Sequence, residues 1–556
     1  MEMRVRLLAS WLGFAAILAL TGCSPSARAQ ENPAAAMFAT ADNCLACHNG
    51  LTTSKGEDFS FGKAWRASMM ANSARDPYWQ AAVRRETIDH PKASDAIEDE
   101  CAICHMPMAR TTAAAMGEHG EIFAHLPLGE MGTHQAQLAA DGVSCTVCHQ
   151  ITPKGLGTRE SFSGRFIVDT TKPFGERPLF GPFPVERGRT RIMHSATGFR
   201  PEQSDHIRQS ELCATCHTLY TNALGPDGKK IGEFPEQVPY LEWRHSDFVN
   251  QLSCLSCHMP AVEETSRMSS VLGEPRDGIG RHDFRGGNFF MLEMLNRYRA
   301  DLAVQAEPAE LDHAARTAVE HLQTAATLEL RIERRSGTQL PIEVTVTNLT
   351  GHKLPTAYPS RRAWIHLIVR DSSKRALFES GAMTPNGAIR GNDNDDDAAR
   401  FESHHRTITS PDQVQIYEPI LMDAGNRVTT GLLSAVRYAK DNRLLPRGFD
   451  KRTAQPDIAV YGEAAQDADF IGDGDRVRYL VPLPEGTGAV TVEAALMFQP
   501  IGFRWAQNLR GYDADEPRRF VRYYDSMSSV SAQALARAKA IESLAAEADR
   551  IMPRHD

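Results

Sequence analysis

The sequence has no long apolar segment after its N-terminus and no excess of basic residues. Its one long apolar run, residues 7–20, is of signal-peptide length and too short for a comfortable membrane span. Among 556 residues, 70 are acidic and 61 are Lys or Arg, which gives a formal net charge of −9. Loss of Glu2, Arg4 and Arg6 would leave −10, because one acidic and two basic residues go. An acidic surface argues against nucleic-acid binding and favours docking to basic patches on protein partners.

Cysteine is also scarce, and its distribution follows a pattern. The chain has 11 cysteines, and ten of them fall in five copies of C-x-x-C-H. In chain order, motifs 1 to 5 are Cys44, Cys47 and His48; Cys101, Cys104 and His105; Cys145, Cys148 and His149; Cys213, Cys216 and His217; and Cys254, Cys257 and His258. The remaining cysteine is Cys23.

C-x-x-C-H is the attachment signature of c-type haem. The two thiols are spaced to form thioethers with the haem vinyl groups, and the adjacent histidine becomes the proximal iron ligand. Half a zinc site or a redox dithiol would also contain C-x-x-C. Zinc does not require a histidine after the second cysteine every time, and a dithiol does not need five copies. We therefore expect five covalently attached haem c groups.

The N-terminus predicts export. Arg4 and Arg6 precede the apolar run, and small residues follow it, so residues 1–22 have the order of a cleaved signal peptide. Residues 20–23 (Leu-Thr-Gly-Cys) resemble the lipobox of bacterial lipoproteins, in which the cysteine, here Cys23, is lipidated. An ordinary cleaved signal with a stray cysteine nearby is the alternative. Export agrees with the motifs, because bacteria attach haem covalently outside the cytoplasm.

The resemblance to lipoproteins also implies a location. Ser24 follows the cysteine where aspartate would imply retention in the inner membrane. We therefore expect a lipid-anchored protein of the cell envelope, on the outer membrane and facing the periplasm or the cell surface. Residues 23–37 are small, polar and Pro-containing, which is typical of a flexible tether.

The rest of the chain divides into two parts with different sequence patterns. Residues 38–300 hold all five motifs, about one per fifty residues, which is too little chain to bury each haem separately. We expect the haems to pack closely there among short helices, loops and few strands. Residues 301–325 predict a helical connector, within which 311–322 has helical periodicity.

The C-terminal part predicts strands. Residues 326–525 contain short alternating segments bounded by Gly, Pro and Asn, which favours a β-sandwich-like antiparallel domain with long insertions. The alternating segments are 327–332, 342–346, 364–369, 477–481 and 490–498. Residues 526–556 are Ala-rich with Leu and Ile at helical spacing, and predict a terminal helix. The expected fold class is α+β, with a mostly helical and irregular cytochrome domain followed by the β domain.

Segments around the motifs resemble a known group of proteins. These segments are 141–144 (DGVS), 210–212 (SEL), 213–221 (CATCHTLYT), 236–243 with Glu236-Gln237 and Tyr240 to Trp243, 282–288 (HDFRGGN) and 351–356 (GHKLPT). They are similar to segments of bacterial multihaem cytochromes c grouped with the hydroxylamine oxidoreductases and the tetrahaem cytochrome of nitrifiers. The resemblance implies a haem-packed electron carrier, although some relatives are enzymes. This chain departs from those enzymes, because it has five motifs instead of eight and no cross-linking tyrosine that we can place.

An electron-transfer haem needs a second axial ligand, usually His or Met. Of the 20 histidines, five are proximal, and the candidates for the distal positions are His134, His194, His206, His282 and His352. In reserve are His90, His119, His125 and His245. For His404, His405 and His555 we expect solvent-facing or hydrogen-bonded side chains. Met106 and Met259 directly follow proximal histidines, so we expect them to pack on haem edges.

Two further features have a functional and a plainer interpretation. The acidic run 392–397 is a possible calcium site, but it lacks the glycine and terminal glutamate of an EF-hand loop, and we expect a solvated loop. Lys353 beside His352 is reminiscent of the lysine that ligates iron in some nitrite reductases, although it lies outside any C-x-x-C motif. We expect no catalytic residue among them.

Three functional hypotheses follow. The first is an exported pentahaem lipoprotein that relays electrons between quinol-linked oxidoreductases and other cytochromes of the envelope. The second is a multihaem oxidoreductase that acts on a small nitrogen or sulfur compound at one five-coordinate haem. The third is self-assembly of subunits into a filament with haems stacked end to end. The many spare histidines and the lack of an acid–base constellation favour the first.

Overall fold

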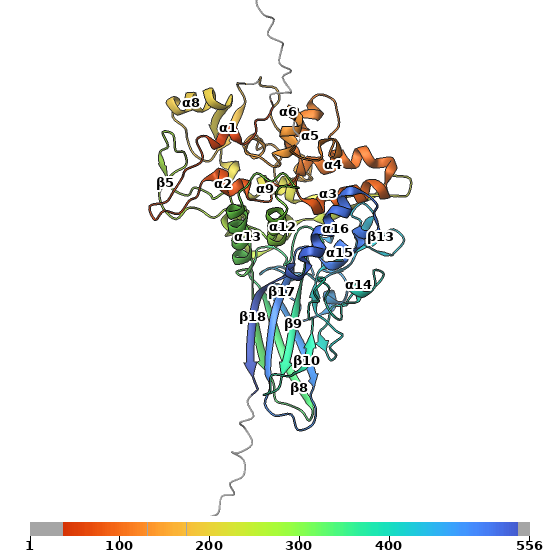
Figure 1. The fold of residues 1–556 in the computed structure, drawn as a ribbon. Coiled ribbons are helices and arrows are strands. Elements are labelled where there is room, and N and C mark those ends of the chain that lie inside the picture. Colours follow the sequence, from red (N-terminus) through yellow and green to blue (C-terminus); the bar gives the residue numbers. More distant parts are fainter. Residues whose placement is uncertain (1–36, 130–131, 174, 543–556) are drawn as a thin grey trace, which may run out of the picture.

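A computed structural model describes residues 37–129, 132–173 and 175–542 (Figure 1). Cys23, the signal peptide and most of the tether lie outside these residues. Helices gather in the N-terminal half and long strands in the C-terminal half. This mixture of helices and strands agrees with the α+β class. None of the helices in the described residues combines the length and apolar character needed to cross a membrane.

The N-terminal half consists of short helices joined by loops. The helices are α1 (Asp42–Leu45), α2 (Phe61–Arg66), α3 (Pro77–Asp89), α4 (Ser94–His105), α5 (Pro107–Ala115), α6 (His134–Ala140), α7 (Cys145–Cys148), α8 (Arg187–Thr197), α9 (Ser210–His217), α10 (Pro239–Arg244), α11 (Cys254–His258), α12 (Phe289–Arg297) and α13 (Pro308–Leu322). Proline occupies the first turn of α3, α5, α10 and α13, where no helical hydrogen bond needs its missing N–H. Local signals therefore start these helices, although they are too short to be stable alone.

Three small sheets interrupt the helices. β1 (Pro178–Gly181) pairs with β2 (Arg200–Gln203), β3 (Leu219–Leu224) with β4 (Lys230–Gln237), and β5 (Ser266–Arg267) with β6 (Pro275–Arg276). This agrees with the expectation of few strands between the motifs.

The C-terminal half is built on two larger sheets. One has the order β10-β9-β17-β18, with β12 also pairing β9, and the other has the order β11-β16-β8-β7. Their strands are β7 (Ala326–Ile332), β8 (Gln339–Asn348), β9 (Arg362–Arg370), β10 (Ala376–Ser380), β11 (Thr407–Ile408), β12 (Ile416–Tyr417), β16 (Gly474–Pro482), β17 (Thr491–Gln499) and β18 (Gln533–Ile541). All five alternating segments of the sequence are strands here. One buried cluster contains Val344 of β8 and Val492 of β17, so the two sheets share a core.

Smaller elements fill the insertions. They are α14 (Asp393–Asp396), a sheet of β13 (Pro419–Asp423), β14 (Val428–Thr429) and β15 (Ala435–Asp441), α15 (Phe503–Asn508) and α16 (Asp515–Met527).

The predicted C-terminal helix is wrong for residues 533–541. They form β18, which pairs antiparallel with β17 from Thr491↔Ile541 to Phe498↔Gln533. Alanine favours helices intrinsically, but the open edge of β17 offers these residues a ladder of hydrogen bonds, and tertiary context overrides the propensity. Residues 543–556 lie outside the described part of the chain.

The two halves share a continuous interior. The hydrophobic cluster of both sheets extends to Leu295 of α12 and Leu311 of α13. Further along the contact, Arg84 of α3 forms an ion pair with Glu516 of α16 at 2.9 Å. The β half is therefore packed on the motif-bearing half, and its loops can reach the motifs.

Candidate haem-attachment sites

Each motif lies on a short helix or at its end. Motifs 2, 4 and 5 occupy the C-terminal ends of α4, α9 and α11, while the cysteines of motif 3 begin and end α7. Motif 1 starts within α1 and continues into the following turn. One helical turn brings the two thiols and the histidine of a motif to the same side of the backbone, as attachment to one haem requires.

Four motif histidines are held by the same kind of hydrogen bond. The Nδ1 atoms of His48, His105, His149 and His258 hydrogen bond to the carbonyl oxygens of Met268 (2.7 Å), Ser73 (3.0 Å), Phe180 (2.6 Å) and Arg285 (2.5 Å). A carbonyl can only accept, so Nδ1 carries the proton and Nε2 keeps its lone pair for a metal. Within the described residues, His217 has no such partner.

Two of these histidines face a second histidine ring. The centres of the His149 and His282 rings are 6.5 Å apart with planes 10° from parallel, and those of His258 and His352 are 6.2 Å apart at 17°. When two imidazoles ligate one iron, two metal–nitrogen bonds of about 2 Å each and the distance from each Nε2 to its ring centre add up. The two ring centres are then roughly 6 Å apart. Both pairs therefore have the separation needed to share one iron.

His282 and His352, the second rings of these pairs, are oriented in the same way as the motif histidines. His282 Nδ1 donates to the carbonyl of Gly280 (3.0 Å), and His352 Nδ1 to that of Lys353 (2.9 Å). Nε2 is again left free. The β half contributes His352 through the loop that follows β8, so motif 5 is completed by both halves of the chain.

Burial keeps these rings neutral. Burial, with smaller contributions from neighbouring histidines, lowers the pKa of His105, His217, His282 and His352 to about 4. A histidine must be neutral to ligate a metal. The donor set therefore fits c-type haem: paired thiols, a neutral imidazole beside them and, at motifs 3 and 5, a second neutral imidazole opposite.

Thiols of different motifs interact. Hydrogen bonding with Cys145 lowers the pKa of Cys44, and the corresponding interaction with Cys213 lowers that of Cys254. Hydrogen bonding with Cys104 raises the pKa of Cys216, and Val147 of motif 3 packs in one apolar cluster with Leu212, which directly precedes motif 4. Motif 1 thus adjoins motif 3, motif 3 adjoins motif 4, and motif 4 adjoins both motif 5 and motif 2.

Three sequence candidates for distal ligands are placed differently. His134 begins α6 and is exposed. His194 lies on α8, and its Nε2 hydrogen bonds to the carbonyl of Gly175 at 2.6 Å. His206 is buried with both nitrogens engaged, Nε2 by the Ile151 carbonyl (2.8 Å) and Nδ1 by the Ser204 hydroxyl (2.7 Å). None of the three is paired with a motif histidine in the described structure, and His206 has no free nitrogen to offer.

The reserve candidates are similarly occupied or distant. His90 Nε2 lies 3.3 Å from the Ser434 hydroxyl, and His245 Nε2 donates to the Asp450 carbonyl at 3.1 Å. His119 is exposed and lines the cleft described below, while burial lowers the pKa of the half-buried His125. No histidine ring lies opposite His48, His105 or His217 within the described residues.

One histidine at the site was missed in the sequence. His321 lies in the last turn of α13, with its ring centre 5.5 Å from that of His258 at 64°. Burial and the charge of His258 lower its pKa to about 4. The amphipathic pattern of 311–322 indicated the helix, but not that its final turn would meet motif 5.

The structure bears on two other sequence features, and for the acidic run it corrects the expectation. Lys353 does not point to an iron site: its Nζ forms a buried ion pair with Asp441 (2.7 Å) and donates to the Ala459 carbonyl (3.1 Å). The acidic run is not a solvated loop throughout. It forms α14, in which Asp395 is buried and binds both terminal nitrogens of Arg362 at 2.8 and 2.9 Å. The charge of Arg362 therefore takes the role that calcium would have had there.

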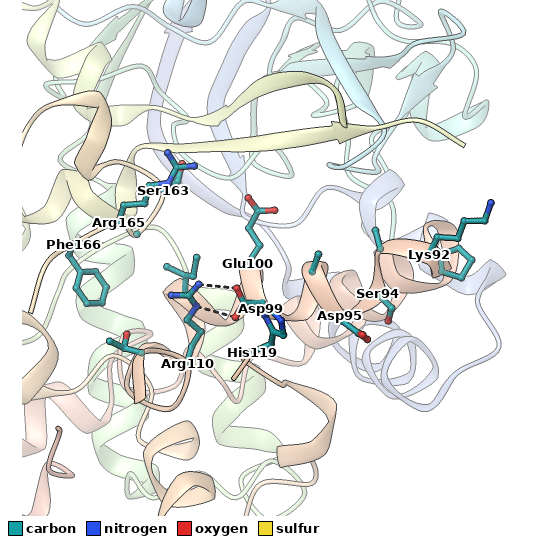
Figure 2. Close-up of a pocket in the computed structure, with 16 residues that line it drawn as sticks. Lys92, Ser94, Asp95, Asp99, Glu100, Arg110, His119, Ser163, Arg165 and Phe166 are labelled. Atoms are coloured by element: carbon teal, nitrogen blue, oxygen red, sulfur yellow. Dashed lines mark hydrogen bonds and ion pairs between the residues drawn. The ribbon is translucent and has the colours of Figure 1, made fainter. Parts of the chain in front are cut away.

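A cleft of about 700 Å³ lies against α4 (Figure 2). Its floor includes Ala96, Asp99, Glu100 and Ile103, which share one face of the helix. The Cys104 thiol of motif 2 lies close to Gly164, which also lines the cleft. Figure 2 shows the fork of Arg110 closed on Asp99, an ion pair of 2.9 Å.

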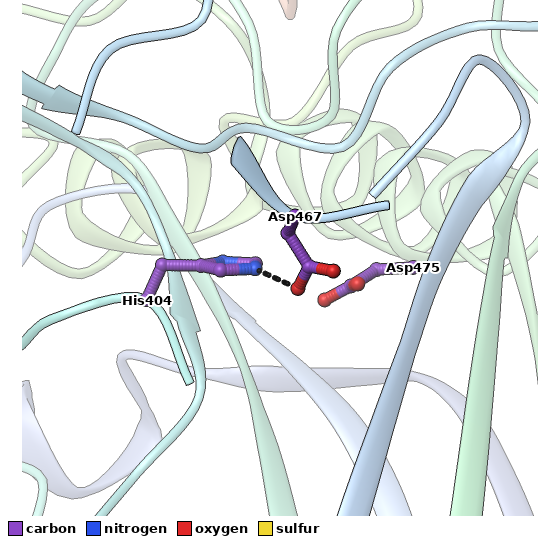
Figure 3. Close-up of side chains that lie close together, drawn as sticks. All are labelled: His404, Asp467 and Asp475. Atoms are coloured by element: carbon purple, nitrogen blue, oxygen red, sulfur yellow. Dashed lines mark hydrogen bonds and ion pairs between the residues drawn. The ribbon is translucent and has the colours of Figure 1, made fainter. Parts of the chain in front are cut away.

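The β half contains a buried group of His404, Asp467 and Asp475 (Figure 3). One nitrogen or oxygen atom of each side chain that could ligate a metal lies within 4.8 Å of the other two. His404 Nε2 donates to Asp467 at 3.0 Å, because Nδ1 accepts hydrogen bonds from the amides of Gln415 (2.8 Å) and Asn442 (3.1 Å). A metal would need the lone pair that this tautomer lacks at Nε2. The group is therefore a hydrogen-bonded network, as expected for His404, and not a metal site.

Comparison with known proteins supports the architecture. No family model matches the chain, and no curated protein does. Among solved structures, the crystal structure of a penta-heme cytochrome c552 from Thermochromatium tepidum is similar with a TM-score of 0.52 and 15% identity, covering 92% of this chain and 100% of that one. At this identity the likeness concerns the fold. The chain therefore shares its overall fold with a penta-heme cytochrome c552.

Proposed function

We propose that the chain is an exported pentahaem c-type cytochrome that relays electrons in the cell envelope. The observation that carries the proposal is the contact between motifs: Leu45 of motif 1 packs with Cys145 of motif 3, Val147 of motif 3 shares a cluster with Leu212 beside motif 4, Cys254 of motif 5 donates to Ser210 on the helix of motif 4, and the thiols of motifs 2 and 4 interact. Haems attached to these thiols would be neighbours along the whole series. Isolated haems would serve a binding protein, but a continuous series serves electron transfer.

The contacts give the relay an order. It runs from motif 1 through motifs 3 and 4 to motif 5, and motif 2 branches from motif 4. The main line ends at motif 1, where Ala46 is exposed, and at motif 5, where Cys257 is exposed; His217 at the junction is exposed as well. We infer that electrons enter and leave at motifs 1 and 5.

The residues that would hold the haems follow from the site. Ten motif cysteines form the thioethers, and the five motif histidines are proximal ligands. His282 and His352 are the distal ligands at motifs 3 and 5. Haem iron supplies reversible one-electron chemistry, and the protein tunes it through ligand identity, hydrogen bonding and burial. The carbonyl partners of Nδ1 fix each ring and raise its basicity.

Location and partners belong to the same proposal. Lipidated Cys23 would anchor the mature chain to the outer membrane, with residues 23–37 as tether. Cys44 follows Cys23 by 21 positions, so the anchor would hold motif 1 near the membrane. Partners would be quinol-linked oxidoreductases or other cytochromes with basic docking patches, matching the net acidic charge.

A second function is favoured by one specific observation. His217, like His48 and His105, has no histidine ring opposite it in the described residues, and its motif is the junction of the relay. An oxidoreductase acting on a small nitrogen or sulfur compound would need such an open position. In that case the other four haems would supply its electrons.

The spin state of each haem separates the two functions. In a pure carrier, every haem of the purified protein is low-spin by electron paramagnetic resonance and binds no carbon monoxide. One full equivalent of high-spin haem that binds nitrite, hydroxylamine or carbon monoxide would establish the oxidoreductase instead. His282→Ala serves as calibration, since loss of a distal ligand should convert one haem to the high-spin form.

A further inference from the structure

Arg361 is a half-buried arginine directly before β9. Its guanidinium is held from two sides, by the Asn288 side-chain oxygen (2.9 Å) and the Thr356 carbonyl (3.0 Å). Burial lowers its pKa to about 10, yet at neutral pH it stays charged. Both partners are neutral acceptors, and together they use two of its five N–H donors.

The acidic groups near Arg361 are engaged elsewhere. Glu242 is 3.0 Å from Arg443, Asp283 is 2.8 Å from Arg285, and Asp395 is bound by the neighbouring Arg362. Within the described residues Arg361 forms no ion pair. A buried charge without a counter-charge is costly, so proteins normally provide an anion for it.

Arg361 lies beside the haem-attachment sites of motifs 4 and 5. Its partner Thr356 lies four residues after His352, and the N–H of Cys254 in motif 5 donates to Ser210 on the helix of motif 4 at 3.1 Å, so the two motifs are neighbours there. Arg361 belongs to the same loop as His352, residues 349–361, which connects β8 to β9. Asn288, which orients it, ends the segment 282–288 that supplies His282 and the carbonyl partner of His258.

We propose that Arg361 is an anion-binding residue that holds a carboxylate or small oxyanion between motifs 4 and 5. The planar guanidinium fork matches both kinds of anion in a bidentate manner, and its two protein contacts fix the direction in which the remaining donors point. The anion is either a haem propionate or a free oxyanion such as nitrite. The inference rests on haem occupancy of the motifs, as in the proposed function.

The test uses the mature holoprotein and three variants. Arg361→Gln removes the charge at similar size, and Arg361→Lys keeps the charge but loses the fork. Arg370→Gln removes one charge from the far end of β9, where the side chain is 38% exposed, and is the control. Haem content is measured first by mass, so that failure of the proposed function is recognised before Arg361 is judged.

The two anion sources give different results. If the anion is a propionate, Arg361→Gln lowers the midpoint potential of one haem, because a nearby cation stabilises the reduced state. Arg361→Lys retains most of the wild-type potential, and nitrite leaves the wild-type spectrum unchanged. If the anion is free, nitrite gives a saturable difference spectrum in the wild type, its affinity falls at least tenfold in Arg361→Lys, and the response is lost in Arg361→Gln.

The proposal is overturned if Arg361→Gln carries five haems with wild-type potentials and the wild type shows no response to nitrite. Should Arg361→Gln fail to mature, Arg361→Met takes its place, because it also removes the charge, and wild-type potentials in that variant with no response of the wild type to nitrite would overturn the proposal. The proposal would also be overturned if Arg370→Gln shifted the midpoint potential as much as Arg361→Gln, since the effect would then come from net charge.

Discussion

His352 lies opposite His258, with ring centres 6.2 Å apart and planes 17° from parallel, although the two residues come from different halves of the chain. Each ring turns Nδ1 to a backbone carbonyl, of Lys353 and Arg285 respectively. The β half therefore does more than cover the motifs. It delivers one of the groups that would complete an iron site.

Removal of this group gives the first prediction. His352→Ala should convert the haem of motif 5 from low-spin to high-spin and allow it to bind carbon monoxide, because the ring opposite His258 is lost. Electron paramagnetic resonance and carbon monoxide difference spectra measure both effects. His134→Ala is the matched control, since His134 was also a sequence candidate but is exposed on α6. Low-spin haem throughout in His352→Ala would show that another residue is the ligand.

The second prediction concerns the ion network behind His352. Asp441 is shared by Lys353 (2.7 Å) and Arg443 (2.8 Å), and all three side chains are buried. Asp441→Asn leaves two buried cations with one fewer anion, which should cost about 3 kcal/mol of unfolding free energy. Lys353→Met should cost less, because Asp441 keeps Arg443. Denaturant unfolding followed by circular dichroism measures both variants, and equal losses would contradict the assignment.

The third prediction is a pH dependence of stability. Burial and the charge of Asp467 raise the pKa of Asp475 to about 7, above its ordinary value near 4. The folded state then binds more protons than the unfolded state between these values, so stability falls as pH rises from about 4 to about 7. Asp475→Asn removes this dependence, and its stability relative to wild type should increase by roughly 2–4 kcal/mol over that range. Melting temperatures at both pH values test this; a difference that does not change with pH would refute it.

The fourth prediction concerns the proposed anchor. Cys23→Ala should release the protein from membranes or block its processing, because no other cysteine stands at the end of the signal peptide. Several acyl chains are needed for firm attachment, and a single chain binds only marginally. Fractionation of cells expressing wild type and variant is the measurement. A wild type found entirely in the soluble periplasmic fraction would exclude the anchor.

Sequence patterns predicted some features well because those features are local. The alternation of apolar and polar residues located five strands, β7, β8, β9, β16 and β17. The spacing of Cys and His identified the motifs. The segments 282–288 and 351–356 pointed to His282 and His352. The ends of the chain show the limit: residues 533–541 look helical, yet they form β18 because the edge of β17 is available.

The pairing of ligands could not be predicted, because it depends on which loop reaches which motif. His206 precedes motif 4 closely, but a carbonyl and a hydroxyl occupy its nitrogens. His321 lies in a connector helix whose last turn meets motif 5 only after α13 packs. Asp395 is similar: an acidic run looks solvated until Arg362 of β9 is placed beside it.

The central claim is that all five motifs carry haem in one continuous series. The most direct test is the intact mass of the mature protein, produced in cells that attach c-type haem and measured after denaturation, when only covalent groups remain. The account predicts the polypeptide plus five haem groups. A fully matured protein with four or fewer would contradict it.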